Sequence, residues 1–431
     1  MQTLNRENFN KNRYPTKIMQ FGEGNFLRAF VDWQIDILNE TTELNAGIAI
    51  IRPIDYDALP LLNVQDGLYT SIIRGLNEQG DVVADHRIIS SVNEEIPVYK
   101  EFAKYMALAE SPDLKIIFSN TTEAGIEYID TDKLTDAPAK AFPAKLTQWL
   151  YHRFEFFSGS KDSGVVIIPC ELIDYNGDKL KEIVLQYCQL WQLSDEFINW
   201  LITANDFCST LVDRIVTGFP RDEHAKLQEE LGYKDNFMVT AEYFHLFVIQ
   251  GPEHLADLLC LEGSELNIKV VDDISPYKQR KVAILNGAHT AMVPLAYMSD
   301  IDSVGEALAD PLFEKYLTAL IFDEIIPTLN LPKDELEAFA NDGDRNACVT
   351  QSFAARPISC QQNDVNIEAA FRKILCQQTQ LFLGTTAVHR GDYQCNTNRH
   401  DTAPNEESPG LDNRSRRINS SSRMNSSIAS P

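Results

Sequence analysis

Three residues that could move a proton lie close together in the last third of the chain. Lys281, Asn286 and His289 belong to the run Lys-Val-Ala-Ile-Leu-Asn-Gly-Ala-His. At about 100° per residue on an α-helix, Asn286 lies about 140° and His289 about 80° around from Lys281, so all three can share one face. The lysine could exchange a proton with a substrate hydroxyl while the amide and the imidazole hold the oxygen. That chemistry suits hydride transfer at a secondary alcohol without a metal. The alternative is an amphipathic helix whose polar side faces water.

Length and composition predict a globular protein of two or three domains. The chain has 431 residues, of which 44% are hydrophobic and 23% charged, as in ordinary globular proteins. It contains no apolar run long enough to span a membrane, and its first residues are polar and do not resemble a signal peptide. We therefore expect a cytoplasmic protein with no membrane partner.

The net charge of −25 argues against a nucleic-acid partner, because phosphates require a basic surface. An anionic small-molecule substrate would need a local basic pocket. None of the eight cysteines forms a Cys-x2-Cys pair, so we expect neither a zinc site nor a redox couple. Cys170 and Cys208 are interpreted as reduced, buried residues, not nucleophiles.

The first 270 residues alternate apolar β-branched runs with helical patterns, which predicts an α/β fold with a parallel sheet and crossover helices. We place the first domain over residues 1–270. The expected strands are residues 17–21, 46–51, 114–119 and 165–169, and the expected helices are residues 26–38 and 97–109.

From Pro276 onward the pattern is helical, with expected helices at residues 277–298, 304–309, 311–326 and 333–340. We assign residues 271–341 to the start of a second, all-helical domain. Residues 342–431 differ in character, with nine acidic and ten basic residues, nine of the latter being arginine. Their polar composition predicts a disordered tail. The abrupt change suggests the hypothesis that this tail is translated from a different reading frame.

A glycine-rich turn follows the first expected strand. Gly22 and Gly24 would allow backbone N–H groups to approach a pyrophosphate, and Asn25 and Phe26 follow them into the first helix. Leu27 occupies the third small position of the usual Gly-x-Gly-x-x-Gly pattern. The alternative is an ordinary strand-to-helix turn.

Other polar residues also follow expected strands, where ligands gather in open parallel sheets. Asp55 could accept the ribose hydroxyls of NAD, whereas Arg52 could bind the additional phosphate of NADP. Asn120 could contact the cofactor or cap its loop.

Two further groups of polar residues have simpler explanations. Glu171 and Asp174 are most simply interpreted as residues that shape a loop, and Asn176 with Gly177 as a turn. The adjacent Asp213 and Arg214 could form a surface ion pair of negligible energy.

Taken together, these stretches resemble the polyol-specific long-chain dehydrogenases, the mannitol dehydrogenase family. The shared runs are Phe21-Gly-Glu-Gly24, Gln65-Asp-Gly-Leu-Tyr69-Thr, Asp213-Arg-Ile and Lys281-x4-Asn286-x2-His289. Within the family, residues 21–34, 119–126, 168–177 and 281–291 are most similar to enzymes that interconvert D-tagaturonate and D-altronate. The resemblance is continuous from about residue 2 to residue 341.

This resemblance implies an NAD-dependent oxidoreductase with a Rossmann-like domain, a helical substrate domain and no metal. Lys281 would be the general acid/base, Asn286 an oxyanion donor, His289 a substrate-orienting group and Asp213 a substrate-site residue. The mannitol enzymes carry a second oxyanion asparagine in a Cys-Asp-Asn run. Because Leu172 occupies that position here, Asn176 is expected to substitute for it in binding substrate.

The resemblance stops at residue 341, where relatives continue with an Arg-Phe-x-Asn-Pro segment and further helices. We therefore predict that this chain is poorly soluble or inactive. The alternatives to tagaturonate chemistry are fructuronate reductase or mannitol 2-dehydrogenase activity, or a catalytically dead product that binds only dinucleotide.

Overall fold

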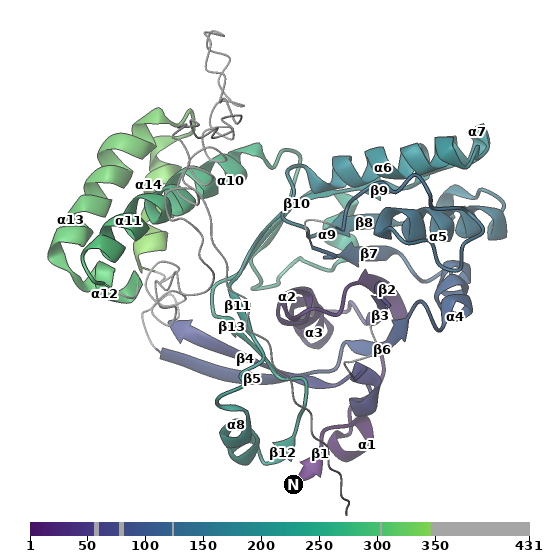
Figure 1. Cartoon of the computed structure of the whole chain (residues 1–431), viewed down its shortest axis with the longest axis horizontal. Coiled ribbons are helices and arrows are strands. Elements are labelled where there is room, and N and C mark those ends of the chain that lie inside the picture. Colours follow the sequence, from purple (N-terminus) through teal and green to yellow (C-terminus); the bar gives the residue numbers. More distant parts are fainter. Residues whose placement is uncertain (56–59, 77–81, 123–124, 302–303, 346–431) are drawn as a thin grey trace, which may run out of the picture. The chain divides into compact units, whose positions relative to one another are not determined.

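The computed structural model describes residues 1–55, 60–76, 82–122, 125–301 and 304–345 (Figure 1). The predicted disordered tail and the reading-frame hypothesis concern residues 342–431, of which residues 346–431 lie outside the described residues. Residues 342–345 continue the last described helix.

A six-stranded parallel sheet forms the centre of the dinucleotide-binding part. Its order is β6 (Val92–Pro97), β3 (Gly47–Arg52), β2 (Thr16–Phe21), β7 (Ile116–Ser119), β8 (Val166–Pro169) and β9 (Asp206–Phe207). The sheet confirms the predicted α/β class, and four of these strands coincide with the four expected ones to within two residues.

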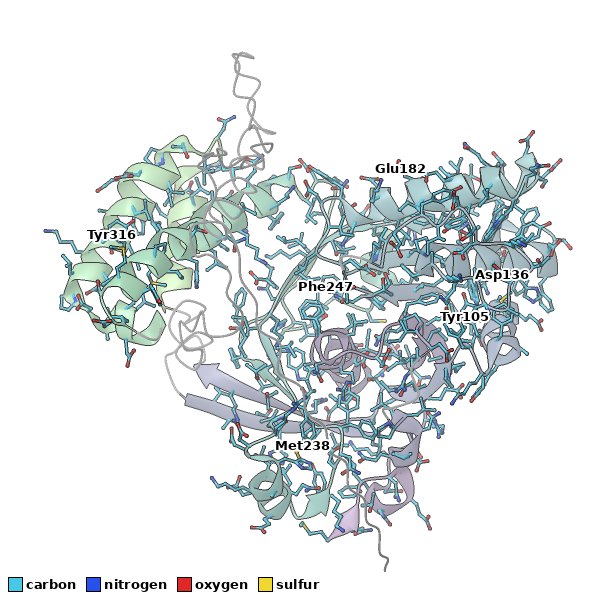
Figure 2. All side chains as sticks on the ribbon, viewed as in Figure 1. Tyr105, Asp136, Glu182, Met238, Phe247 and Tyr316 are labelled. Atoms are coloured by element: carbon cyan, nitrogen blue, oxygen red, sulfur yellow. The ribbon has the colours of Figure 1, made fainter. Side chains whose placement is uncertain are left out.

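Both faces of this sheet are buried, which explains why the inner strands β3, β7 and β8 are mostly apolar and do not alternate. On β7, Ile116 and Phe118 enter one core while Ile117 enters the other. The first core includes Phe247, which is labelled in Figure 2. It also includes Phe30, whose ring centroid lies 5.1 Å from that of Phe247. The second core is covered by helices α5 (Phe142–Phe156), α6 (Asn176–Leu190) and α7 (Asp195–Ala204) (Figure 1).

Two further sheets contain antiparallel pairs that the sequence reasoning missed. One joins β11 (Val216–Gly218), β13 (Val239–Glu242), β4 (Tyr69–Leu76) and β5 (Val82–Ile89), and another joins β10 (Ser209–Asp213), β14 (Leu246–Gln250) and β15 (Ile268–Val271). A short parallel pair joins β1 (Gln2–Thr3) and β12 (Tyr233–Lys234). The sheet with β10 matters for the site, because the end of β10 carries Asp213.

The expected helix at residues 26–38 is two helices, α2 (Asn25–Ala29) and α3 (Val31–Thr41), which meet at Phe30. The break has a physical cause. The carbonyl of Arg28 accepts a hydrogen bond from the Tyr69 hydroxyl at 2.8 Å, and the carbonyl of Ala29 accepts one from Arg214 at 2.8 Å. Side-chain donors thus engage carbonyls that a continuous helix would use for its own ladder.

The expected helix at residues 97–109 was wrong at its start. Pro97 is the last residue of β6 and pairs with Arg52, and α4 begins only at Phe102 (Phe102–Ala107). The remaining short helices of this part are α1 (Arg6–Phe9), α8 (His224–Leu231) and α9 (His254–Leu258). The short 3-10 turns η1 (Leu62–Gln65), η2 (Leu108–Glu110) and η3 (Lys161–Ser163) lie in the same part.

The residues after Asp273 are helical, as predicted. They form α10 (Ser275–Arg280), η4 (Lys281–Asn286), α11 (Gly287–Met298), α12 (Val304–Ala309), α13 (Pro311–Ala319), η5 (Leu320–Ile325), η6 (Ile326–Thr328) and α14 (Lys333–Arg345). A third core, which includes Ile284, Met292 and Leu317, holds them together. The proposed boundaries at residues 270 and 341 stay predictions.

Candidate active site

The helix that carries Lys281 contains a π segment that includes two of the proposed site residues, Lys281 and Asn286. Helices α10 and α11 are joined by η4, a π-helix from Lys281 to Asn286. Hydrogen bonds of a π segment run from residue i to i+5, so residues five apart lie on nearly the same side. The 140° separation expected for Lys281 and Asn286 on an ideal α-helix is therefore too large. Single π turns of this kind are frequent at functional sites.

Lys281 connects this helix to the end of strand β10. Its Nζ lies 3.0 Å from Oδ1 of Asp213 and donates to the carbonyl of Val212 at 3.1 Å. Both charged side chains are only 14% exposed. In such a shielded setting an ion pair is screened less than on the open surface. The structure thus brings together Asp213 and Lys281, two residues proposed from separate sequence runs.

His289 lies on α11, beyond the π segment, and is largely buried. Its Nδ1 pairs with the carbonyl of Leu285 at 3.1 Å, so the neutral ring carries its hydrogen on Nδ1 and presents Nε2 as an acceptor. Burial lowers the pKa of His289, whereas the Leu285 carbonyl and the Asp213 carboxylate oppose that shift. The imidazole is therefore neutral near physiological pH.

Asn286 ends the π segment and is partly exposed. Its backbone carbonyl accepts a hydrogen bond from Thr290 at 2.8 Å.

At the other part of the proposed site, the turn after β2 depends on Gly22. Its φ is +111°, and a Cβ there would lie 2.7 Å from the carbonyl oxygen of Asn120, so only glycine fits. Gly24 differs, because its φ of −64° is ordinary and a Cβ would meet no atom within 4 Å. Nothing in the described packing requires glycine at position 24.

Asn25 and Phe26 open helix α2. The Oδ1 of Asn25 accepts a hydrogen bond from Arg28 at 2.6 Å. The half-buried ring of Phe26 stacks on Phe30, with 5.0 Å between centroids. Both residues therefore also have contacts within the fold.

Asn120 follows β7 and binds the neighbouring strand end. Its Nδ2 donates to the carbonyl of Cys170 at 2.8 Å, and its backbone N–H donates to Phe21 at 3.0 Å. Of the two roles considered for Asn120, the loop-capping role is visible in these contacts, and cofactor contact stays a prediction.

Arg52 and Asp55 differ sharply in their surroundings. Arg52 is 5% exposed, and its Nε lies 2.6 Å from Glu95 and 3.7 Å from Glu23. Burial raises the pKa of Glu95, against the effect of the Leu62 N–H and of Arg52. Asp55, three residues further on, is exposed. The arginine is thus already engaged by carboxylates, whereas the aspartate lies on the surface.

The contacts of Asn176 differ from those expected of a substrate-binding residue. It is fully buried at the start of α6. Its Nδ2 lies within 3.0 Å of the carbonyls of Pro169 and Glu171 and of the Thr210 hydroxyl, and its Oδ1 accepts from Gly177 and Thr210. Two amide hydrogens already face three acceptors, so none is left for a substrate. These contacts join β8 to β10.

Arg214 is buried within the fold. Arg214 is not paired at the surface with Asp213, as one interpretation held. It is 5% exposed, stacks over Trp33 at 4.1 Å, and burial lowers its pKa to about 9.

Cys170 and Cys208 are buried and unbridged, as predicted, and burial raises the pKa of Cys208 to about 12.

Sequence matches to known proteins decide the family. The family's Rossmann-domain model (Mannitol dehydrogenase Rossmann domain) matches residues 16–263, and its Mannitol dehydrogenase C-terminal domain matches residues 273–342. The chain belongs to the mannitol dehydrogenase family. It is accordingly an oxidoreductase that acts on a CH–OH group, and the family resemblance inferred from its motifs is confirmed.

Among members of the mannitol dehydrogenase family, altronate oxidoreductases are highly similar to this chain. The protein from Escherichia coli O6:K15:H31 (strain 536 / UPEC) is 61% identical over 341 residues, which are 79% of this chain and 71% of that protein. The protein from Yersinia enterocolitica serotype O:8 / biotype 1B (strain NCTC 13174 / 8081) is 60% identical over 340 residues, 79% of this chain and 70% of that protein.

Two solved structures of the mannitol dehydrogenase type share the fold. Substrate-free D-sorbitol dehydrogenase matches with a TM-score of 0.67 at 18% identity, over 82% of this chain and 76% of that one. Mannitol 2-dehydrogenase from Pseudomonas fluorescens, in a ternary complex with NAD and D-mannitol, matches with a TM-score of 0.64 at 20% identity, over 83% and 75%. Within the part of this chain that the structure describes, no helix is long and apolar enough to cross a membrane.

Proposed function

We propose that this chain interconverts D-altronate and D-tagaturonate with NAD(H) as the hydride carrier. The observation that carries the proposal is the identity of 60–61% to altronate oxidoreductases over about four fifths of the chain. This similarity favours tagaturonate chemistry over the fructuronate or mannitol alternatives.

The proton-transfer step is assigned to Lys281. NADH supplies the hydride to the keto carbon when it is bound, and the keto oxygen then needs a proton. The Lys281 ammonium, held by Asp213 at 3.0 Å and Val212 at 3.1 Å, is positioned to give it. In the reverse direction, the neutral amine accepts the hydroxyl proton of altronate.

Three neighbouring side chains are assigned to orientation of the substrate. Asn286 donates an amide hydrogen to the reacting oxygen, and the neutral His289 accepts a hydrogen bond from a substrate hydroxyl. Asp213 fixes the lysine and lies at the substrate end of β10. The contacts of Asn176 favour a structural role for that residue instead.

The strand ends suit a dinucleotide. Gly24 has neither a conformational nor a packing reason to be glycine, and close approach of a bound pyrophosphate supplies one. The residues assigned to the cofactor are Gly22, Gly24, Asn25, Phe26, Asp55 and Asn120. Because Arg52 is engaged by Glu95 and Glu23, a 2′-phosphate would meet carboxylates near that strand end, which favours NAD over NADP. Cytoplasmic location stays a prediction.

A side-by-side assay tests the proposal. The full chain is incubated with saturating NADH and, in turn, with tagaturonate, fructuronate and fructose over a range of concentrations, while NADH oxidation is followed. We expect the highest kcat/KM with tagaturonate, and a lower one when NADPH replaces NADH. Faster turnover of either other substrate would contradict the assignment. NADH binding in a thermal-shift titration without any turnover would support the dead-product alternative.

A further inference from the structure

Glu171 is a buried carboxylate at the end of β8 to which neither the fold nor the proton transfer assigns a role. Glu171 is 2% exposed. Oε1 accepts from the backbone N–H of Thr121 at 2.9 Å and from its hydroxyl at 3.0 Å, and Oε2 accepts from the Ser119 hydroxyl at 3.0 Å. All three donors belong to the segment where β7 ends.

Between those two partners lies Asn120, the residue that closes the turn after β2. Its carbonyl oxygen would be 2.7 Å from a Cβ on Gly22, so this carbonyl packs directly on the glycine turn. Its Nδ2 donates to Cys170, next to Glu171 in the chain. Glu171 therefore fixes Asn120 on both sides along the backbone, and through Asn120 it restricts the path of the Gly22 turn.

We propose that Glu171 is a positioning residue for dinucleotide binding, which holds the Ser119–Thr121 segment against the Gly22 turn. The inference rests on the proposed function in one respect, namely that the Gly22 turn binds NAD(H). In this proposal Glu171 does not contact NAD(H) but influences the affinity of the protein for it.

The cost of burying this carboxylate supports a role beyond stability. Burial raises the pKa of Glu171, and the hydrogen bonds from Thr121 and Ser119 oppose that shift only in part. No ion pair with a cation is found for Glu171 among the described residues, and burying a charge without one is unfavourable. A glutamine of the same shape can accept the two Thr121 bonds on its one oxygen, but it carries no charge and its NH2 group can no longer accept from the Ser119 hydroxyl, so the charge-assisted bonds are lost.

The test compares Glu171→Gln with Asp235→Asn in the full-length chain. Asp235 is a matched control, because it is also buried and accepts three hydrogen bonds, from Gln65, Thr70 and Phe237, none of which belongs to the Ser119–Thr121 segment or the Gly22 turn. For each variant we would measure Tm, the Kd for NADH by fluorescence titration, and kcat and KM with the sugar acid.

We expect Glu171→Gln to raise the Kd and KM for NADH on the order of tenfold, about the loss expected from a hydrogen bond to a charged group. The kcat at saturating NADH and the KM for the sugar acid should stay within about threefold. Asp235→Asn and Glu171→Gln should lower Tm by similar amounts, but Asp235→Asn should leave the Kd for NADH unchanged. Ser119→Ala, which removes one donor and leaves the carboxylate, should shift the Kd in the same direction by less.

A pH titration gives an independent readout. As pH falls, the carboxylate gains a proton and loses acceptor capacity, so the Kd of the wild type for NADH should rise, whereas that of Glu171→Gln should be flatter. A Kd unchanged in both Glu171→Gln and Ser119→Ala would overturn the inference, as would equal losses of affinity in Glu171→Gln and Asp235→Asn. A wild type that binds no NADH would instead overturn the proposed function, and the inference with it.

Discussion

The strand ends of the six-stranded sheet and the helix that carries Lys281 are built in different ways. At the strand ends, side chains that are far apart in sequence hold the loops, as Glu171 holds Thr121 and Asn176 joins β8 to β10. On the helix, Lys281, Asn286 and His289 are neighbours in sequence, and the salt bridge to Asp213 ties them to the sheet part.

The two regions also differ in how they treat apolar side chains. The cores on both faces of the sheet fully bury large side chains such as Phe30, Phe118 and Trp149. Helix α11, in contrast, exposes four large apolar side chains in six residues: Val293, Leu295, Tyr297 and Met298. Under the proposed function, cofactor binding falls to the tightly packed region and proton transfer to a helix with one well-buried side. The two functions should therefore be separable by mutation.

The largest expected effect is the loss of turnover in Lys281→Ala. Removal of the proton donor should lower kcat by about 10²- to 10⁴-fold, while the Kd for NADH stays within about twofold because no strand-end contact changes. Lys278→Ala is the matched control, since this neighbouring lysine pairs with Asp174, and its kcat should change by less than about threefold. A parallel loss of NADH affinity in Lys281→Ala would show that the two regions are not separable.

The next largest effect is expected for two methionines on α11. Comparing them tests whether only one side of this helix is buried. Met292 is 1% exposed and belongs to the third core, whereas Met298 is 81% exposed. Met292→Ala should cost about 2–5 kcal/mol of unfolding free energy, and Met298→Ala should lie within about 0.5 kcal/mol of the wild type. Chemical denaturation measures both. Similar losses for the two variants would mean that the exposed side of α11 is covered by other parts of the molecule.

The sequence predicted what depends on local pattern. Strands such as β3 and β8 were recognised because both faces of the sheet are buried, which leaves an uninterrupted apolar run. The grouping of Lys281, Asn286 and His289 was also local. The break at Phe30 was not predictable, because it depends on Tyr69 and Arg214, which are 41 and 185 residues from their acceptors.

The parts of the site that were missed depend on long-range contacts or on small shifts of the backbone. Nothing in the run from Lys281 to His289 distinguishes a π segment from an α-helix. The π segment buries Ala283 and Ile284, and an amphipathic α-helix of this sequence could bury the same two residues. Glu171 was interpreted as a residue that shapes the loop before the next helix, but its hydrogen-bond partners, Ser119 and Thr121, lie where another strand ends. Asn176 was expected to bind substrate because its position follows a family motif, and that reasoning could not reveal that its amide is already saturated within the fold.

The smallest expected effect concerns Asp32, a carboxyl group in the first turn of α3 that contributes to the tight packing of the sheet part. It is fully buried, and burial raises its pKa to about 7, against the effect of the Tyr69 hydroxyl that donates to it at 3.0 Å. A raised pKa means that the fold favours the neutral form. The stability this provides is complete below the ordinary pKa of 3.8 and is lost as pH rises through about 7.

Asp32→Asn, which cannot ionise, should therefore have a Tm a few degrees above that of the wild type at about pH 8, and this advantage should vanish at about pH 4. Asp36, one turn further along α3, is the control. Its carboxylate accepts hydrogen bonds from Arg87, Ser90 and Ser91, so Asp36→Asn should lower the Tm at about pH 8, where those charged bonds are intact. Thermal unfolding across this pH range distinguishes the two aspartates. If Asp32→Asn were instead destabilising at high pH, the buried carboxylate would be a stabilising partner of Tyr69, and the sheet part would tolerate buried charge better than its packing indicates.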